Sequence, residues 1–245
     1  MDILWAAVIG FVVGISGTVF GGLVIYRFGE GPIKQSGLIG LSGGIMVAVV
    51  LLDLWPEALH YGGWAPTILG TGLGVIIIRY FETMMQLIPW YRQRNFSKST
   101  KLGLLMGMGI GTHNFPEGVA LGTMYIANPY IQYWGGLGLL MALHNIPEGM
   151  VMASALKLGK VRFSKIVAAL FLVEVPMAVG AMIGAFVGQI SGWAASMALG
   201  FAGGAMIFLV IQELLPMAKK IAGLLWTGFG FIIGFGLGVV LVKII

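Results

Sequence analysis

The chain has 245 residues, of which 58% are hydrophobic and only 9% are charged, and its formal net charge is +5. Soluble proteins carry roughly 25% charged residues, so this composition excludes an ordinary soluble domain and predicts an all-α integral membrane protein. Cysteine is absent, which excludes a disulfide framework and cysteine-bound zinc. The basic residues fall mainly in short connections, so the positive charge is no signal for a nucleic-acid partner.

Eight apolar stretches are long enough to cross a bilayer as helices, which takes ~20 residues each. The connections between them are short and polar, so we predict a single transmembrane domain over 1–245 with both termini on one side. The N-terminal segment has no basic region ahead of its apolar run, so no cleaved signal peptide is predicted. The predicted spans are 3–26, 37–59, 64–88, 101–126, 132–156, 164–190, 193–216 and 222–243.

The distribution of Lys and Arg predicts the orientation of these spans. The connections after the first, third, fifth and seventh spans are basic, whereas the alternate connections carry no Lys or Arg. Because cytoplasmic loops are enriched in Lys and Arg, we predict that both termini face outside. Trp64, Trp134 and Trp193 then open spans at the outer interface, where aromatic residues gather. The expected location is the cell membrane (the inner or plasma membrane), as a multi-pass protein.

The second and seventh spans resemble each other. The segment GGIMVAVVLLDLWPEA aligns with GGAMIFLVIQELLPMA, which pairs Asp53 with Glu213 and Pro56 with Pro216. In the predicted topology these two spans run in opposite directions. We therefore predict an eight-helix inverted-repeat (3+2+3) bundle, in which the first three spans are related to the last three and the fourth to the fifth. Such folds bind their substrate near the membrane midplane.

Two near-identical hexapeptides, HNFPEG and HNIPEG, start at His113 and His144 in the fourth and fifth spans. On a helix, His and Glu four residues apart share one face, and the Asn lies on an adjacent face. Proline removes one backbone donor and clashes with the preceding turn, so both helices are expected to break there. Broken helices that carry imidazole and carboxylate at membrane depth predict a transition-metal site. Two chance kinks would not account for the repetition.

Other embedded side chains are candidates for the same pathway. Glu174, close to Pro176, is a further candidate ligand, with a helix-packing hydrogen bond as the alternative. Asp53 and Glu213 lie nearer the span ends, where they either concentrate cations at the entrance and exit or accept hydrogen bonds from neighbouring helices. Met46 shares a helix face with Asp53 and is either a soft ligand or a packing residue. So many embedded carboxylates require a cation or protonation.

Both hexapeptides resemble the signature of the ZIP (Zrt-, Irt-like protein) metal-ion transporters, and the short prokaryotic members most closely. The likeness covers essentially the whole chain, including DLWPEA on the second span and QELLP on the seventh. It implies outside termini, a binuclear site between the fourth and fifth spans, homodimers, and elevator-like alternating access. The implied first metal position uses His113, His144, Glu148 and Met46. The implied second uses Asn114, Glu117, Asn145, Glu148 and Glu174. Asp53 would stand at the entrance, and Gln212 and Glu213 at the exit.

The expected function is import of a divalent transition metal, with zinc first and iron, manganese and cadmium as further candidates. The metal is the substrate and no cofactor is expected, nor is direct ATP drive, because no GxxxxGK[ST] motif is present. The alternative is an intramembrane metal-dependent hydrolase, which would use a metal-activated water. Against it, the neighbour of each His is Asn, whereas the zinc-protease motif HExxH has Glu there. A haem protein with axial His113 and His144 is disfavoured by the adjacent carboxylates.

Two features depart from the ZIP pattern. Asn145 stands where some relatives have an Asp that bridges both metals, which lowers the charge available to a second metal position. The connection between the third and fourth spans has no His-rich run, so no cytoplasmic metal-sensing loop is expected.

Overall fold

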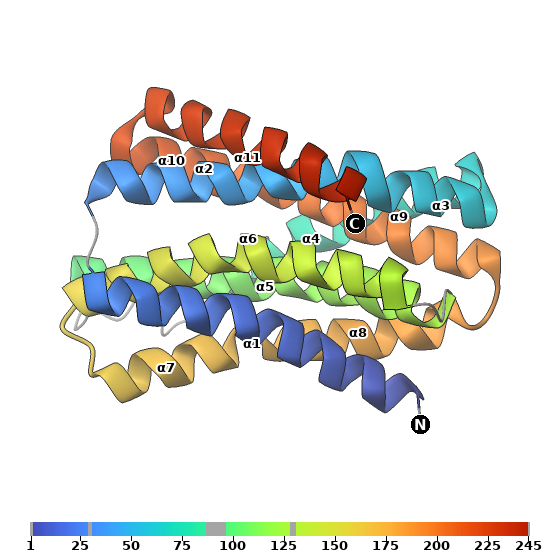
Figure 1. Cartoon of the computed structure of the whole chain (residues 1–245), viewed down its shortest axis with the longest axis horizontal. Coiled ribbons are helices and arrows are strands. Elements are labelled where there is room, and N and C mark those ends of the chain that lie inside the picture. Colours follow the sequence, from blue (N-terminus) through green and yellow to red (C-terminus); the bar gives the residue numbers. More distant parts are fainter. Residues whose placement is uncertain (1, 29–30, 87–96, 128–130, 245) are drawn as a thin grey trace.

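We describe the protein from a computed structural model that covers residues 2–28, 31–86, 97–127 and 131–244. The described residues form helices and short connections, without strands, which confirms the all-α prediction. The helices lie along one long axis, and successive runs point in opposite directions, so α1 begins and α11 ends toward the same end of the bundle (Figure 1). They are α1 (Asp2–Phe28), α2 (Pro32–Val49), η1 (Val50–Leu54), α3 (Trp55–Gly62), α4 (Trp64–Gln86), α5 (Lys98–Ala127), α6 (Ile131–Leu158), α7 (Phe163–Leu172), α8 (Val175–Gly188), α9 (Gly192–Leu209), η3 (Val210–Leu214), α10 (Leu215–Ala222) and α11 (Leu224–Ile244).

Within the described ranges, 6 helical runs are both long and apolar enough to cross a membrane. They correspond to α1, α2 to α3, most of α6, α7 to α8, α9 to α10, and α11. The apolar part of α4 is shorter, over Trp64–Tyr80. Helix α5, which carries the first hexapeptide, is long but is not among these apolar runs. The chain is therefore a multi-pass membrane protein whose most polar span is the one that carries the first hexapeptide.

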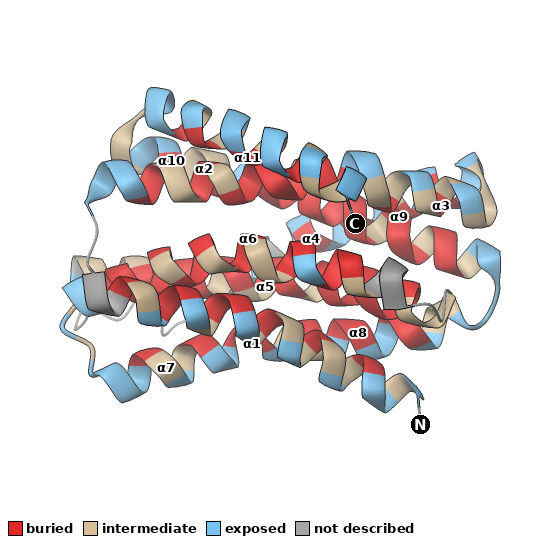
Figure 2. Cartoon of the chain, in the orientation of Figure 1, coloured by how far each residue is buried: buried red, intermediate tan, exposed pale blue. Residues whose placement is uncertain are grey.

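The central helices are the most buried. Figure 2 shows α5 and α6 largely buried in the middle of the bundle, while α1, α7 and α11 expose their outer faces. The helices pack most closely in pairs: α1 with α6, α5 with α8, α2 with α11, and α4 with α9. The outer faces are rich in exposed Leu, Ile, Val and Phe, as expected of surfaces that face lipid.

The hexapeptide glycines allow two of these close contacts. A Cβ on Gly149 of α6 would overlap the backbone of Thr18 on α1, and a Cβ on Gly118 of α5 would overlap the backbone of Met177 on α8. Small residues let helix backbones approach closely in membranes. Both glycines are therefore explained by packing.

The predicted breaks at the hexapeptides are wrong. Both α5 and α6 are continuous, with Pro116 and Pro147 inside them. A proline removes one hydrogen bond and adds one local clash, and the flanking turns are held by tight packing against α8 and α1. The interruption falls instead between α7 and α8, at Val173 and Glu174, just before Pro176.

The two repeated segments each contain a π-helical turn, η1 and η3, which ends two residues before a proline. The amide of Trp55 donates to the carbonyl of Val50, five residues back, and Leu215 donates to Val210 in the same way. Single π turns of this kind are frequent at functional sites. The chain reverses soon after each at a glycine with positive φ, Gly63 at +77° and Gly223 at +88°. These corresponding turns extend the likeness between the two halves.

Candidate metal site

Seven predicted ligands are buried in the middle of the bundle, and each is at most 4% exposed. They come from α5, α6 and the junction of α7 with α8, so the interrupted run contributes to the same region as the two hexapeptide helices. Buried polar groups in a membrane interior are costly unless they bind one another or a ligand. These residues are His113, Asn114, Glu117, His144, Asn145, Glu148 and Glu174.

An ion-pair geometry links the two hexapeptides across the helix interface. The Nε2 atom of His144 on α6 lies 3.0 Å from Oε1 of Glu117 on α5. Glu148 also interacts electrostatically with His144, and Glu174 interacts with both Glu117 and Glu148. The side chains therefore form one electrostatic cluster that spans α5, α6 and the α7–α8 junction.

Each histidine ring is oriented by its own helix. The Nδ1 atom of His144 lies 3.0 Å from the carbonyl oxygen of Leu140, and Nδ1 of His113 bonds the carbonyl of Gly109 in the same way. A carbonyl oxygen only accepts, so Nδ1 carries the proton in both rings. Metal-binding histidines usually donate their second ring N–H in this manner, which directs Nε2 to the metal. The arrangement thus presents two Nε2 atoms to the cluster.

Hydroxyl groups from α1 and α2 hold two of the carboxylates. Thr18 Oγ1 donates to Oε1 of Glu174, and Ser42 Oγ donates to Oε1 of Glu148 at 2.7 Å. Both hydroxyl residues are fully buried. Sequence reasoning missed Thr18 and Ser42, because isolated hydroxyl residues in apolar helices are common; each does lie beside a glycine, in SGT and LSGG.

The cluster keeps unused lone pairs. Within the part of the chain that the structure describes, the buried second oxygens of Glu117, Glu148 and Glu174 have no hydrogen-bond partner, and neither do Nε2 of His113 or the two polar side-chain atoms of Asn145. The Nδ2 atom of Asn114 donates to the carbonyl of Val173 at 2.8 Å, and its Oδ1 is likewise without a partner. Unsatisfied buried polar groups are rare and indicate a missing ligand or ion. The oxygen and imidazole donors fit a borderline divalent cation.

The buried polar residues of the described ranges include the three carboxylates but no Lys or Arg. Three carboxylates with no buried Lys or Arg beside them repel one another unless a metal ion, an imidazolium or added protons compensate their charge. In the present arrangement no three His, Asp or Glu side chains of the described residues converge closely enough to hold a metal ion. The hydrogen bond between His144 and Glu117 occupies two of the donors that such a site would use.

The remaining predicted residues lie outside this cluster. Glu213 lines a small cavity of about 20 Å³ together with His113 and Glu148, which places the predicted exit carboxylate next to the ligands. Gln212 is exposed, and Asp53 is half-buried in η1. Met46 is fully buried in the apolar core of α2, and no hydrogen bond or ion pair of the described residues joins it to the cluster.

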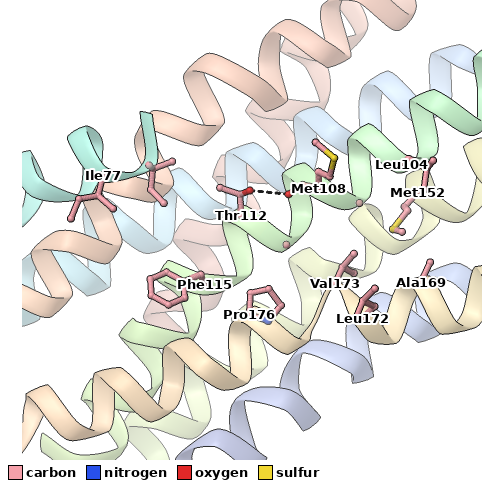
Figure 3. Close-up of a pocket in the computed structure, with 13 residues that line it drawn as sticks. Ile77, Leu104, Met108, Thr112, Phe115, Met152, Ala169, Leu172, Val173 and Pro176 are labelled. Atoms are coloured by element: carbon pink, nitrogen blue, oxygen red, sulfur yellow. Dashed lines mark hydrogen bonds between the residues drawn. The ribbon is translucent and has the colours of Figure 1, made fainter. Parts of the chain in front are cut away.

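An apolar crevice of about 560 Å³ lies behind the site, between α4, α5 and the α7–α8 run (Figure 3). Thr112 and Val173, which directly precede His113 and Glu174, form part of its wall. The Thr112 hydroxyl donates to the carbonyl of Met108 at 2.8 Å, so its proton is already engaged. None of the described residues that line this crevice is ionisable.

The chain is similar to a family of known proteins. The family model described as "ZIP Zinc transporter" matches residues 91–244, which include both hexapeptides and Glu174. The chain is 28% identical to the "Zinc transporter ZupT" of Stenotrophomonas maltophilia (strain R551-3), over 95% of this chain and 93% of that protein. It is 30% identical to ZupT of Enterobacter sp. (strain 638), over 91% and 92%, and 31% identical to ZupT of Shigella flexneri, over 75% and 74%. The family is one of transporters and not of enzymes, and this chain belongs to it: it is a member of the ZIP family.

Proposed function

We propose that this protein carries divalent transition-metal ions across the cell membrane into the cytoplasm, and that zinc is its principal substrate. The observation that carries the proposal is the buried cluster of two imidazoles and three carboxylates, which has unused lone pairs and no Lys or Arg among the buried residues described. Family membership supports the same function, because the similar proteins are named zinc transporters. It also argues against the hydrolase alternative.

The cluster suits a transported ion better than a permanently bound one. A structural zinc site is closed and tetrahedral, whereas this cluster has its donors partly engaged with one another. For a metal to reach Nε2 of His144, any proton shared with Glu117 must leave, so metal binding and proton release are linked at this pair. Such an exchange lets the site bind on one side of the membrane and release on the other.

Two metal positions are proposed within the cluster. The first is built on His113, His144 and Glu148, with Met46 as the implied fourth ligand. The second is built on the Asn114, Glu117, Asn145 and Glu174 side chains and shares Glu148 with the first. Each of the three glutamates has one carboxylate oxygen without a described hydrogen-bond partner. These oxygens support two metal positions, because each position then has a carboxylate oxygen that is available to bind metal. Asn145 is neutral, so the second position has less charge than in relatives with Asp there.

The proposed topology is the 3+2+3 inverted repeat with both termini outside. In this repeat, the packed pair of α1 and α6 corresponds to the pair of α8 and α5. The pair of α2 and α11 corresponds in the same way to the pair of α9 and α4. The matching π turns and the matching glycine turns at Gly63 and Gly223 give further support.

We propose alternating access in which the group α1, α5, α6, α7 and α8 slides against α2, α4, α9 and α11. Asp53 would attract metal at the entrance, and Gln212 and Glu213 would line the exit. A homodimer within the lipid bilayer is the proposed assembly.

Uptake into proteoliposomes tests the proposal directly. Purified protein is reconstituted with a zinc-sensitive dye inside, and zinc is added outside with and without excess Mn²⁺, Fe²⁺, Cd²⁺ or Mg²⁺. We expect zinc to enter and transition metals to compete, whereas Mg²⁺, which prefers an all-oxygen shell, does not. Liposomes that contain His144→Ala protein are the control for leakage. Equal zinc signals in the two preparations would refute the proposed function.

A further inference from the structure

A second apolar crevice, of about 550 Å³, opens between α1, α2, α6 and α11. Of the described residues that line it, Lys34 is charged, and the others are aliphatic, Met or aromatic side chains and glycines. The wall residue Ile25 is only 2% exposed, whereas Phe229 is 59% exposed, so the crevice reaches inward from the surface that faces lipid. It lies away from the metal cluster, and none of the proposed ligands lines it.

The size and lining of this crevice suit a hydrocarbon chain. An apolar cavity of about 150 Å³ can hold one benzene molecule, so 550 Å³ leaves room for on the order of 20 carbon atoms. Gly37 and Gly230 both line the crevice, and a Cβ on Gly230 would overlap the carbonyl of Gly37, so the helix backbones meet there. Because neither glycine has a side chain, neither residue projects into the crevice.

Lys34 defines the polar end. It lies in the first turn of α2, is exposed, and belongs to the end of the bundle that carries the basic connections. Cytoplasmic leaflets are rich in anionic lipids, and basic pockets between transmembrane helices on that side bind their headgroups. An ammonium group at the mouth of an apolar crevice is complementary to a phosphate that is attached to an acyl chain. We propose that this crevice binds one anionic phospholipid, with an acyl chain between α1 and the α2–α11 pair and its phosphate at Lys34.

The crevice in Figure 3 provides an internal comparison. It has nearly the same volume, about 560 Å³, and lies between α4, α5 and the α7–α8 run. Under the proposed repeat, these elements correspond to α11, α6 and α1 around the Lys34 crevice. None of the described residues that line the Figure 3 crevice is basic. Both crevices can accept hydrocarbon, but of these two only the Lys34 crevice has a described basic residue in its wall, so its own preference for an anionic headgroup should depend on Lys34.

The test is native mass spectrometry of detergent-purified protein incubated with phosphatidylglycerol or with phosphatidylcholine of the same acyl chains. Wild type is expected to retain one phosphatidylglycerol in preference to phosphatidylcholine. Lys34→Gln should weaken phosphatidylglycerol binding at this crevice about fivefold, the effect of one basic residue near an anionic surface, and should reduce the preference accordingly. Lys165→Gln is the matched control, because Lys165 is exposed on α7 at the same end of the bundle and does not line the crevice.

A second pair of variants tests the acyl position. A Cβ on Gly37 would meet no closer atom than the Trp226 carbonyl at 4.0 Å, so Gly37→Phe or the smaller Gly37→Leu should fill the crevice without a backbone clash. Either should displace the bound phosphatidylglycerol. Gly236→Phe is the control, since Gly236 is exposed on α11, has no atom near its Cβ position and lies outside the lining.

Two results would overturn the proposal. One is unchanged phosphatidylglycerol retention in folded Lys34→Gln, which would remove the headgroup contact. The other is unchanged retention in a folded Gly37 variant, which would exclude the crevice as the acyl site. If Gly37→Phe instead converts a dimer to a monomer in light scattering without loss of lipid, the crevice is an interface between two copies of the chain. None of these measurements depends on metal transport, so they test the lipid site independently of the proposed function.

Discussion

Glu117 and His144 form a cross-helix pair, with Oε1 of the carboxylate 3.0 Å from Nε2 of the imidazole, although they are 27 residues apart in sequence. The pair joins the two copies of the hexapeptide at the interface of α5 and α6. Both partners are fully buried. His144 also donates from Nδ1 to the carbonyl of Leu140, whereas the second oxygen of Glu117 has no hydrogen-bond partner among the described residues. The linkage makes the protonation of one hexapeptide depend on the other.

The first prediction is a pH dependence. Metal needs the lone pairs of His113 and His144, and protons compete for the same atoms. Protonation of these atoms raises the apparent KM for zinc, so affinity should fall as the pH falls, by up to about tenfold per pH unit for each proton displaced. Zinc uptake measured from pH 7.5 to 5.5 checks this. A KM that stays constant over that range would exclude both histidines as ligands.

The second prediction concerns Thr18, whose hydroxyl bonds Glu174 from the neighbouring helix α1. Thr18→Val keeps the shape but leaves a buried carboxylate oxygen without its donor, which costs about 1–3 kcal/mol. We expect several-fold slower zinc uptake and a lower unfolding temperature in detergent. Thr18→Ser restores the hydroxyl and should recover most of the uptake. If Thr18→Val and Thr18→Ser behave alike, the hydroxyl does not position Glu174.

The third prediction concerns the glycine of the second hexapeptide. A Cβ on Gly149 would overlap the backbone of Thr18, so Gly149→Ala should force α1 and α6 apart and destabilise the protein by about 1–3 kcal/mol, the usual cost of overpacking. Gly72→Ala is the control, because Gly72 is exposed on α4 with no atom near its Cβ position. Thermal unfolding of the two variants should differ clearly. Equal unfolding temperatures would mean that the contact between α1 and α6 is not close-packed.

The fourth prediction concerns orientation, and the absence of cysteine makes it simple to test. Ser164→Cys places a thiol on exposed α7 at the basic end, and Ile190→Cys places one at the opposite end. An impermeant maleimide added to intact cells should label position 190 and not position 164, because basic connections stay in the cytoplasm. Reversed labelling would place both termini inside and exchange the proposed entrance and exit.

The sequence was sufficient for the helical architecture and for finding the polar residues that are buried inside the bundle, because both depend on local pattern. Long apolar runs have few alternatives to a spanning helix, and charged residues inside them stand out. Helix geometry correctly placed His113 and Glu117 one turn apart. It could not show that Glu117 would hydrogen-bond His144, because that pairing depends on how α5 and α6 are rotated against each other.

The incorrect and missed predictions also concern contacts between helices. A proline weakens a helix locally, but packing against neighbouring helices decides whether the helix breaks, and both α5 and α6 remain continuous. Thr18 and Ser42 were missed because a hydroxyl gains its role only from the carboxylate opposite it on another helix. Contacts between helices are thus the part of the site that the spacing of residues in the sequence cannot predict.

The central claim is that the buried histidine and carboxylate cluster is the path of the metal. Glu148 tests it best, because it receives a hydrogen bond from Ser42, interacts electrostatically with His144 and borders the cavity that reaches Glu213. Removal of a buried carboxylate also relieves its desolvation cost, so Glu148→Ala should remain folded. Asp2→Ala, which removes an exposed carboxylate, is the control.

The decisive measurement is zinc uptake into proteoliposomes together with the number of zinc ions bound per chain, for wild type, Glu148→Ala, Glu174→Ala and Asp2→Ala, each checked for folding by size-exclusion chromatography. We predict that Glu148→Ala abolishes uptake and weakens binding at both proposed positions, that Glu174→Ala weakens only the second position and leaves partial uptake, and that Asp2→Ala matches wild type. Normal zinc uptake by folded Glu148→Ala protein would contradict the account.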